Sequence, residues 1–194
     1  MFLNVYLKLF VILTPFFVMS AFLSLTRGFT PTERKKAAGK VTLAIVLSVF
    51  TIYLFGRHIF ALFGITLDAF RIGAGAVLFL SAVSMVRGPT AVTPPSPGED
   101  VAVVPLAIPI AVGPGTIGAL LVMAAEPKSL AARLVTAGAM LAAIATVGLL
   151  LSVAGRLEKV VGHQGLTILT KLTGLFVSAI AAQIFFTGLK NFLA

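Results

Sequence analysis

Apolar residues follow one another in long runs along this chain, and short polar stretches separate the runs. A helix that crosses a bilayer needs about 20 mostly apolar residues, and each run is long enough to supply them. The runs cover Leu3–Leu25, Val41–Phe63, Leu67–Val86, Val101–Ala125, Leu130–Ala154 and Leu166–Leu189. This pattern predicts an all-α, polytopic membrane protein with six transmembrane helices.

The polar stretches indicate where helices begin and where the chain divides. Thr30 precedes Pro31 and is followed by Glu33, which is the signature of a capped helix start. Residues 88–100 are rich in proline and glycine, so we expect a connector there rather than a helix. It separates a first three-helix unit, residues 1–87, from a second unit, residues 101–194. A short loop is expected between the last two runs, with Arg156, Glu158, Lys159 and His163.

The two units share an order of features. Each holds a run broken by proline, a plain run, a short loop with glycine, and a run with a cation near its start. After a shift of 99–100 residues, Thr14-Pro15 falls on Gly113-Pro114, and Arg71 falls on Lys171. Because each unit has an odd number of helices, the two would insert with opposite orientation, as in the inverted repeats of many secondary transporters. The alternative is that any two halves of a six-span protein look alike.

Helix-breaking residues interrupt the first and fourth runs. Thr14-Pro15 lies in the middle of the first run, and Pro105, Pro109 and the segment Gly113-Pro114-Gly115-Thr116 interrupt the fourth. Irregular backbone at membrane depth is tolerated where it is buried or lines a wet cavity. The N–H groups and carbonyls freed at such breaks attract a carboxylate and an ammonium, respectively. The breaks are therefore a candidate site for a small zwitterion, and kinks that only shape the helices are the alternative interpretation.

Ionisable and polar side chains inside the runs are further candidates. Arg71 and Lys171 each lie about one turn from the expected interface, where they either snorkel to the headgroups or contact a substrate carboxylate. Asp68 is spaced to pair with Arg71 on one helix face, and it is also a candidate proton site. Ser20 and Ser24 follow the first break on one face, so they would line a polar path or bond back to carbonyls.

Composition narrows the class of protein. Apolar residues make up 59% of the 194 residues, charged residues 11%, and there is no cysteine. A soluble domain has about 25% charged residues, so these values exclude a soluble enzyme and a disulfide scaffold. The chain has two histidines and six acidic residues, so we expect no catalytic residue, no metal site and no cofactor.

The net charge of +9 comes from basic residues that mainly flank the apolar runs. No basic helix or aromatic platform stands apart from a run, so nucleic-acid binding is not expected. The loop after the first run carries five basic residues. The positive-inside rule places this loop in the cytoplasm and both termini outside the cytoplasmic (inner) membrane.

Several stretches resemble the MarC family of six-span bacterial and archaeal membrane proteins. They are Leu23-Ser24-Leu25-Thr26 with Thr32-Glu33-Arg34, Phe63-Gly64-Ile65 with Phe70-Arg71-Ile72-Gly73-Ala74-Gly75, Pro105-Leu106-Ala107-Ile108-Pro109 with Gly113-Pro114-Gly115, and Lys171-Leu172-Thr173-Gly174-Leu175 with Ala181-Ala182-Gln183. The family is similar to small neutral amino-acid transporters and lies near the LysE-type exporters. The resemblance implies transport of glycine- or alanine-sized amino acids. The family usually has Asn-Pro in the first span, where this chain has Thr14-Pro15.

Together with the broken helices, the resemblance predicts a secondary transporter that moves small neutral amino acids by alternating access. The predicted substrate contacts are Thr14, Pro15, Arg71, Gly113, Pro114, Gly115, Thr116 and Lys171. The expected partners are the lipid bilayer and a small zwitterionic substrate. Coupling to a proton or sodium gradient is left open, and a homo-oligomer is compatible with the sequence. An ion-permeable channel and a non-transporting membrane partner protein are the alternative functions.

Overall fold

A computed structural model describes residues 1–88, 111–126 and 129–193, apart from the side chains of Arg57, Ile59 and Ala61. Over these ranges the chain is helical and contains no strand, so the expected all-α class is confirmed. The helices are α1 (Phe2–Ile12), α2 (Pro15–Leu25), α3 (Pro31–Phe63), α4 (Leu67–Arg87), α5 (Pro114–Ala125) and α6 (Leu130–Leu193). The expected connector beyond Gly88 and the prolines at 105 and 109 lie outside the described residues.

Four segments of the described chain are long and apolar enough to cross a membrane. They are Phe2–Leu25, Pro31–Gly56, Leu67–Arg87 and Leu130–Leu193, whereas α5 is apolar but shorter. α3 begins well before its apolar run because the expected cap forms at Thr30. The Glu33 N–H donates to Thr30 Oγ1 (3.3 Å), and the Thr30 N–H donates to Glu33 Oε2 (2.8 Å).

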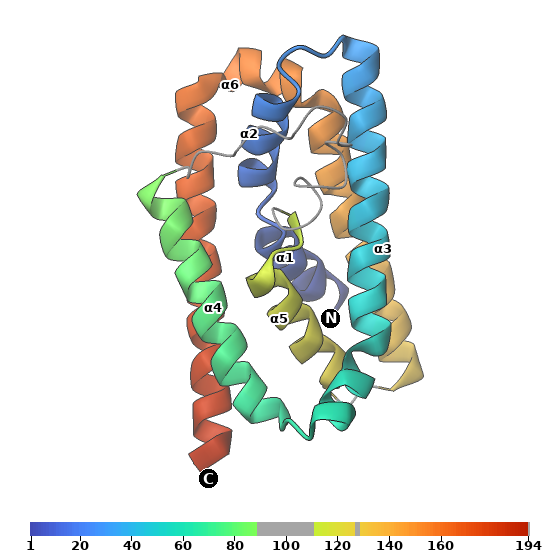
Figure 1. Cartoon of the computed structure of the whole chain (residues 1–194), viewed down its shortest axis with the longest axis vertical. Helices are drawn as coiled ribbons and strands as arrows, with labels where there is room; N and C mark the ends of the chain where they lie inside the picture. The colour runs from blue at the N-terminus through green and yellow to red at the C-terminus, as the bar shows by residue number, and fades with distance from the viewer. Residues whose placement is uncertain (89–110, 127–128, 194) are drawn as a thin grey trace.

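The last two apolar runs form two helices that meet directly at Gly162, with no loop between them, and α6 comprises both. Within α6, only Gly162 has non-helical torsion angles, with φ 72° and ψ 166°. The expected loop is therefore wrong: Arg156, Glu158 and Lys159 continue the helix, because their straight side chains favour it, and His163 follows the break directly. Glycine adopts a positive φ at no steric cost. The chain reverses at this residue, and α6 rises, turns across the top of the view and descends (Figure 1).

The outer helices enclose two short central segments, α1 with α2 and α5. In the view of Figure 1, α1, α2 and α5 lie between α3 with the first part of α6 on one side and α4 with the second part of α6 on the other. α1 and α2 run upward in this view, and α5 runs downward beside them. The two interrupted stretches of the sequence are therefore brought side by side in the interior.

Two apolar clusters pack the interior, and α5 belongs to both. The larger cluster joins α1, α2, α3 and the first part of α6, and it includes Leu13, Phe22 and Leu120. The smaller joins α4 and the second part of α6, and it includes Ile12 and Ala119. The neighbouring residues Ile12 and Leu13 enter different clusters, because successive residues at the end of α1 point to different sides of the helix.

Glycines allow α4 to approach the second part of α6 closely. A Cβ atom added to Gly75 would lie 2.8 Å from the backbone nitrogen of Phe185, and one added to Gly188 would lie 2.8 Å from the carbonyl oxygen of Asp68. Small residues let membrane helices pack backbone against backbone. These contacts hold the second part of α6 firmly against α4.

Candidate functional site

The first break centres on Thr14, which has a left-handed backbone with φ 48° and ψ 57°. Among the described residues it is the only non-glycine with a positive φ. Pro15 starts α2 and has no N–H to continue the α1 ladder. The Thr14 N–H instead donates to Val11 O (3.0 Å), which closes α1 with a tighter turn. Among the described residues no side chain caps the first turn of α2, so its N–H groups lack an acceptor there.

The start of α5 repeats this arrangement. Gly113 precedes the helix, Pro114 is its first residue, and no side chain caps it. Thr116 joins the two breaks: its hydroxyl oxygen lies 3.4 Å from Ile12 O at the end of α1 and 3.3 Å from Ala111 O before α5. Thr14 and Thr116 are both buried, at 9% and 6% exposure. The breaks in the two halves of the chain therefore meet at a buried point.

A cavity of about 260 Å³ lies at this meeting point, and we call it the break cavity. Its lining consists of Ile12, Thr14 and Phe17, the α4 residues Leu78, Ser81, Ser84, Met85 and Gly88, the segment Gly113–Thr116, and Val177 of α6. Pockets for drug-sized ligands measure about 300–1,000 Å³. The break cavity is thus suited to a smaller solute.

No ionisable side chain is among the described residues that line the break cavity. Among the described residues, backbone groups and hydroxyls supply its polarity. Two helix N-termini, those of α2 and α5, meet there, and each carries roughly half a positive charge. The carbonyl oxygens of Ile12 and Ala111 lie near Thr116 at the same point. The described lining of the cavity therefore offers both N–H donors and carbonyl acceptors, and it contains no ionisable side chain.

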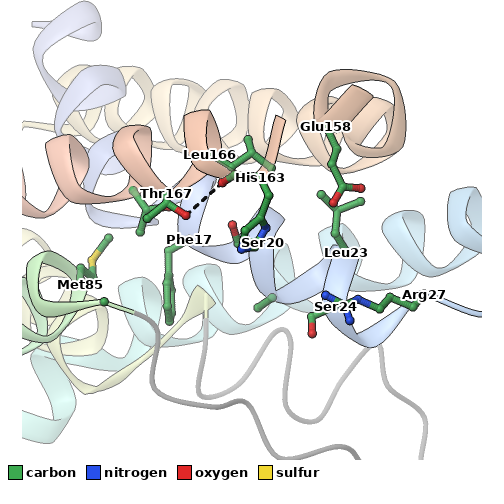
Figure 2. A pocket seen from close by; sticks show the side chains of 13 residues that line it. Phe17, Ser20, Leu23, Ser24, Arg27, Met85, Glu158, His163, Leu166 and Thr167 are labelled. Atoms are coloured by element: carbon green, nitrogen blue, oxygen red, sulfur yellow. Dashed lines mark hydrogen bonds between the residues drawn. The ribbon is translucent and has the colours of Figure 1, made fainter. Parts of the chain in front are cut away.

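A second pocket of about 250 Å³ adjoins the break cavity and shares Phe17, Met85 and Gly88 with it. We call it the hydroxyl pocket. Ser20 and Ser24 line it from α2, as the sequence predicts for a polar path. Thr167 and Thr170 line it from α6. Figure 2 shows Thr167 with Arg27, Glu158 and His163 around the same space.

The structure brings most of the sequence-predicted contact residues together. Thr14, Gly113, Pro114, Gly115 and Thr116 all line the break cavity, and Pro15 adjoins it as the first residue of α2. Gly115 also packs against α4: an added Cβ would lie 3.0 Å from the Cα of Leu78. Any larger residue at 115 would therefore disturb helix packing as well as the cavity.

Arg71 and Lys171 are not brought to either pocket. Arg71 Nη1 lies 2.9 Å from Asp68 Oδ1, the pairing expected from their spacing, and its Nη2 lies 3.4 Å from Glu126 Oε1. Asn191 Nδ2 also donates to Asp68 Oδ1 (3.2 Å). This polar cluster ties the start of α4 to the ends of α5 and α6. Lys171 lies exposed on the outer face of α6.

The α4 and α6 linings were not anticipated from the sequence. Leu78, Ser81 and Ser84 contribute one face of α4 to the break cavity, and Thr167 and Thr170 contribute one face of α6 to the hydroxyl pocket. The available signal was a pair of hydroxyl residues about one turn apart in an apolar run, the pattern already noted at Ser20 and Ser24. It does not tell which side of a helix faces inward.

Comparison with known proteins relates the whole chain to one family of membrane proteins. A family model described as "MarC family integral membrane protein" matches residues 1–193. The UPF0056 membrane protein MJ1677 of Methanocaldococcus jannaschii is 32% identical, over 96% of this chain and 94% of its own length. The UPF0056 membrane protein YhcE of Escherichia coli is 28% identical, over 96% of this chain and 90% of its own. No solved structure matches the chain.

Proposed function

The chain belongs to the MarC family of integral membrane proteins, and we propose that it is a secondary transporter of small neutral amino acids. The observation that carries the proposal is the meeting of two uncapped helix N-termini at a buried cavity. Broken helices whose ends face each other are a recurring way to bind a charged solute in a membrane. The solute would be about the size of glycine or alanine.

The chemistry of the break cavity favours a zwitterion over a net ion. Free N–H groups in the first turns of α2 and α5 would hold a carboxylate, because helix N-termini attract anions. The carbonyl oxygens of Ile12 and Ala111, which lie next to Thr116, would accept from an ammonium group. A solute with both groups satisfies both ends of the site, whereas an ion of one sign would satisfy only one.

The proposed transport cycle uses the two units of the chain as inverted three-helix repeats, six spans in all, in the cytoplasmic membrane with both termini outside. The opposed directions of α1–α2 and α5 in Figure 1 support this plan. Alternating access would then come from one unit rocking against the other around the break cavity. The reaction is movement of the solute without chemical change, driven by its own gradient or by a proton or sodium gradient.

The proposal is tested by uptake of labelled glycine and alanine into proteoliposomes. We expect saturable uptake, and we expect Thr116→Val to raise its KM about tenfold, because the variant removes a buried hydroxyl and leaves its carbonyl partners without a donor. Thr116→Ser keeps the hydroxyl and should restore uptake. Thr187→Val is the matched control, since Thr187 is exposed on α6 and bonds only within its own helix.

Three results would separate the functions. Flux that rises linearly with glycine concentration indicates a channel instead of a transporter. Saturable uptake that Thr116→Val leaves unchanged removes the break cavity from the path. If neither amino acid produces flux or shifts the thermal stability of the protein, the proposed function is wrong.

A further inference from the structure

The hydroxyl pocket holds polar groups that lack partners. Thr170 is 8% exposed, and its Oγ1 atom has no hydrogen-bond partner among the described residues. Its neighbour Thr167 donates to His163 O (3.0 Å), as the dashed line in Figure 2 shows. A buried hydroxyl without a partner costs about 1–3 kcal/mol. Thr170 is one of the residues that line the hydroxyl pocket of about 250 Å³, so a polar ligand in this pocket would lie next to a hydroxyl that lacks a partner.

Two described side chains of opposite charge line the same pocket without forming an ion pair with each other. Arg27 follows the end of α2, Glu158 lies on α6 just before its break, and both contribute to the lining. Within the described part of the chain, neither side chain takes part in an ion pair or a hydrogen bond. Figure 2 shows Arg27 reaching back toward Ser24, with Glu158 on the facing helix. A separated pair of this kind can be bridged by a molecule that carries both charges.

Arg27 is not needed to stabilise the C-terminal end of α2. That role belongs to Arg34 of α3, whose Nη2 donates to Thr26 O (2.9 Å). Cations near a helix C-terminus interact favourably with its carbonyls, so Arg34 supplies this interaction and the Arg27 guanidinium stays available to the pocket. Arg34 therefore has a structural role, whereas Arg27 lines the hydroxyl pocket.

We propose that the hydroxyl pocket is a second binding site for a zwitterionic amino acid, which the solute occupies before or after the break cavity. The inference rests on the proposed function. The ammonium group lies at Glu158, the carboxylate lies at Arg27, and the hydroxyl of Thr170 bonds the solute between them. Because the two pockets share Phe17, Met85 and Gly88, the solute passes from one to the other without crossing a further helix.

The absence of native cysteine makes a direct test available. Single cysteines are introduced as Ser24→Cys and Thr170→Cys in full-length protein in proteoliposomes, and their reaction with a membrane-impermeant cationic methanethiosulfonate is timed. We expect both to react, and we expect Leu172→Cys on the outer face of α6 to stay unlabelled in lipid. Phe29→Cys, exposed between α2 and α3, should react whether or not glycine is present.

Glycine is the probe of occupancy. At about four times its dissociation constant it leaves about one fifth of the sites free, so labelling of the pocket cysteines should slow about fivefold. Adding Glu158→Gln should raise the dissociation constant about tenfold, because a charge-assisted bond is lost. The same glycine concentration should then slow labelling only about 1.4-fold. Adding Thr116→Val should leave the protection in place, because that change lies in the break cavity.

The outcomes distinguish the second site from the function as a whole. If protection disappears with Thr116→Val and survives Glu158→Gln, it comes from the break cavity, and the second site is wrong. Saturable uptake without any protection at Ser24→Cys and Thr170→Cys also overturns the second site while the proposed function stands. If there is neither uptake nor protection, both proposals fail.

Discussion

The left-handed backbone of Thr14 predicts that this protein is more stable with a different residue at that position. Its φ of 48° and ψ of 57° place a β-branched residue in a region that costs an L-amino acid roughly 1–2 kcal/mol. Asn tolerates this region better, because its short polar side chain bonds to the local backbone. The break cavity, which Thr14 lines, gives the amide space. We expect Thr14→Asn to stabilise the fold by about 1 kcal/mol.

Two further variants separate backbone strain from other effects. Thr14→Gly relieves about 1–2 kcal/mol of strain, but it loses about 0.5–1 kcal/mol to the more flexible unfolded chain and about 0.8 kcal/mol from the buried methyl group. Its net effect should therefore be close to zero. Thr14→Val removes the hydroxyl but keeps the branched side chain, so it keeps the strain and should bring no gain.

Thermal unfolding of the purified protein in one detergent measures these differences. For a chain of this size, 1 kcal/mol corresponds to a shift in Tm of about 2–4 °C. Thr14→Asn should melt higher by about that amount, with Thr14→Gly and Thr14→Val near the parent protein. If Thr14→Asn melts at or below the parent, or if Thr14→Val matches a stabilised Thr14→Asn, then strain at position 14 is not what the substitution relieves.

Two other predictions concern packing and charge. Gly75→Ala should destabilise the protein by about 1–3 kcal/mol, because the added methyl group overlaps the backbone of Phe185. Gly73→Ala, where nothing lies within 4 Å, should be neutral or stabilising, and equal Tm values for the two variants would contradict the close contact. Asp68→Asn should cost about 1 kcal/mol, since it breaks a partly buried ion pair with Arg71. It should leave the KM for uptake unchanged, and lost uptake at normal stability would instead make Asp68 part of the transport path.

The sequence predicts the two breaks well, because proline and glycine act locally on the backbone. Thr14-Pro15 needs no tertiary contact to interrupt a helix, and the same holds for Gly113 and Pro114. We expected the two breaks to form one site because the two units of the sequence share an order of features. The sequence signal for a site at the breaks was strong because two separate stretches of the chain contain helix-breaking residues.

The rest of the site depends on which helix faces meet. Arg71 and Lys171 occupy similar positions along their runs, and that similarity suggested a shared role. Depth in the membrane does not determine direction, however: Arg71 turns to Asp68 and Glu126, while Lys171 is exposed. The inward face of α4 likewise depends on glycine contacts with α6 that are more than 100 residues away in sequence.

The break at Gly162 also determines how the two parts of α6 can rotate relative to each other. The part of α6 before it packs in the larger cluster, and the part after it packs in the smaller one, except for Leu166, which belongs to the larger cluster. No loop residues lie between the two parts of α6, so Gly162, with its φ and ψ bonds, is the hinge between them. A rotation about φ or ψ of Gly162 would change the distance between Glu158 and Thr170, which lie before and after this residue in α6. A change in the width of the hydroxyl pocket by this rotation would therefore also shift the two parts of α6 against the clusters in which they pack.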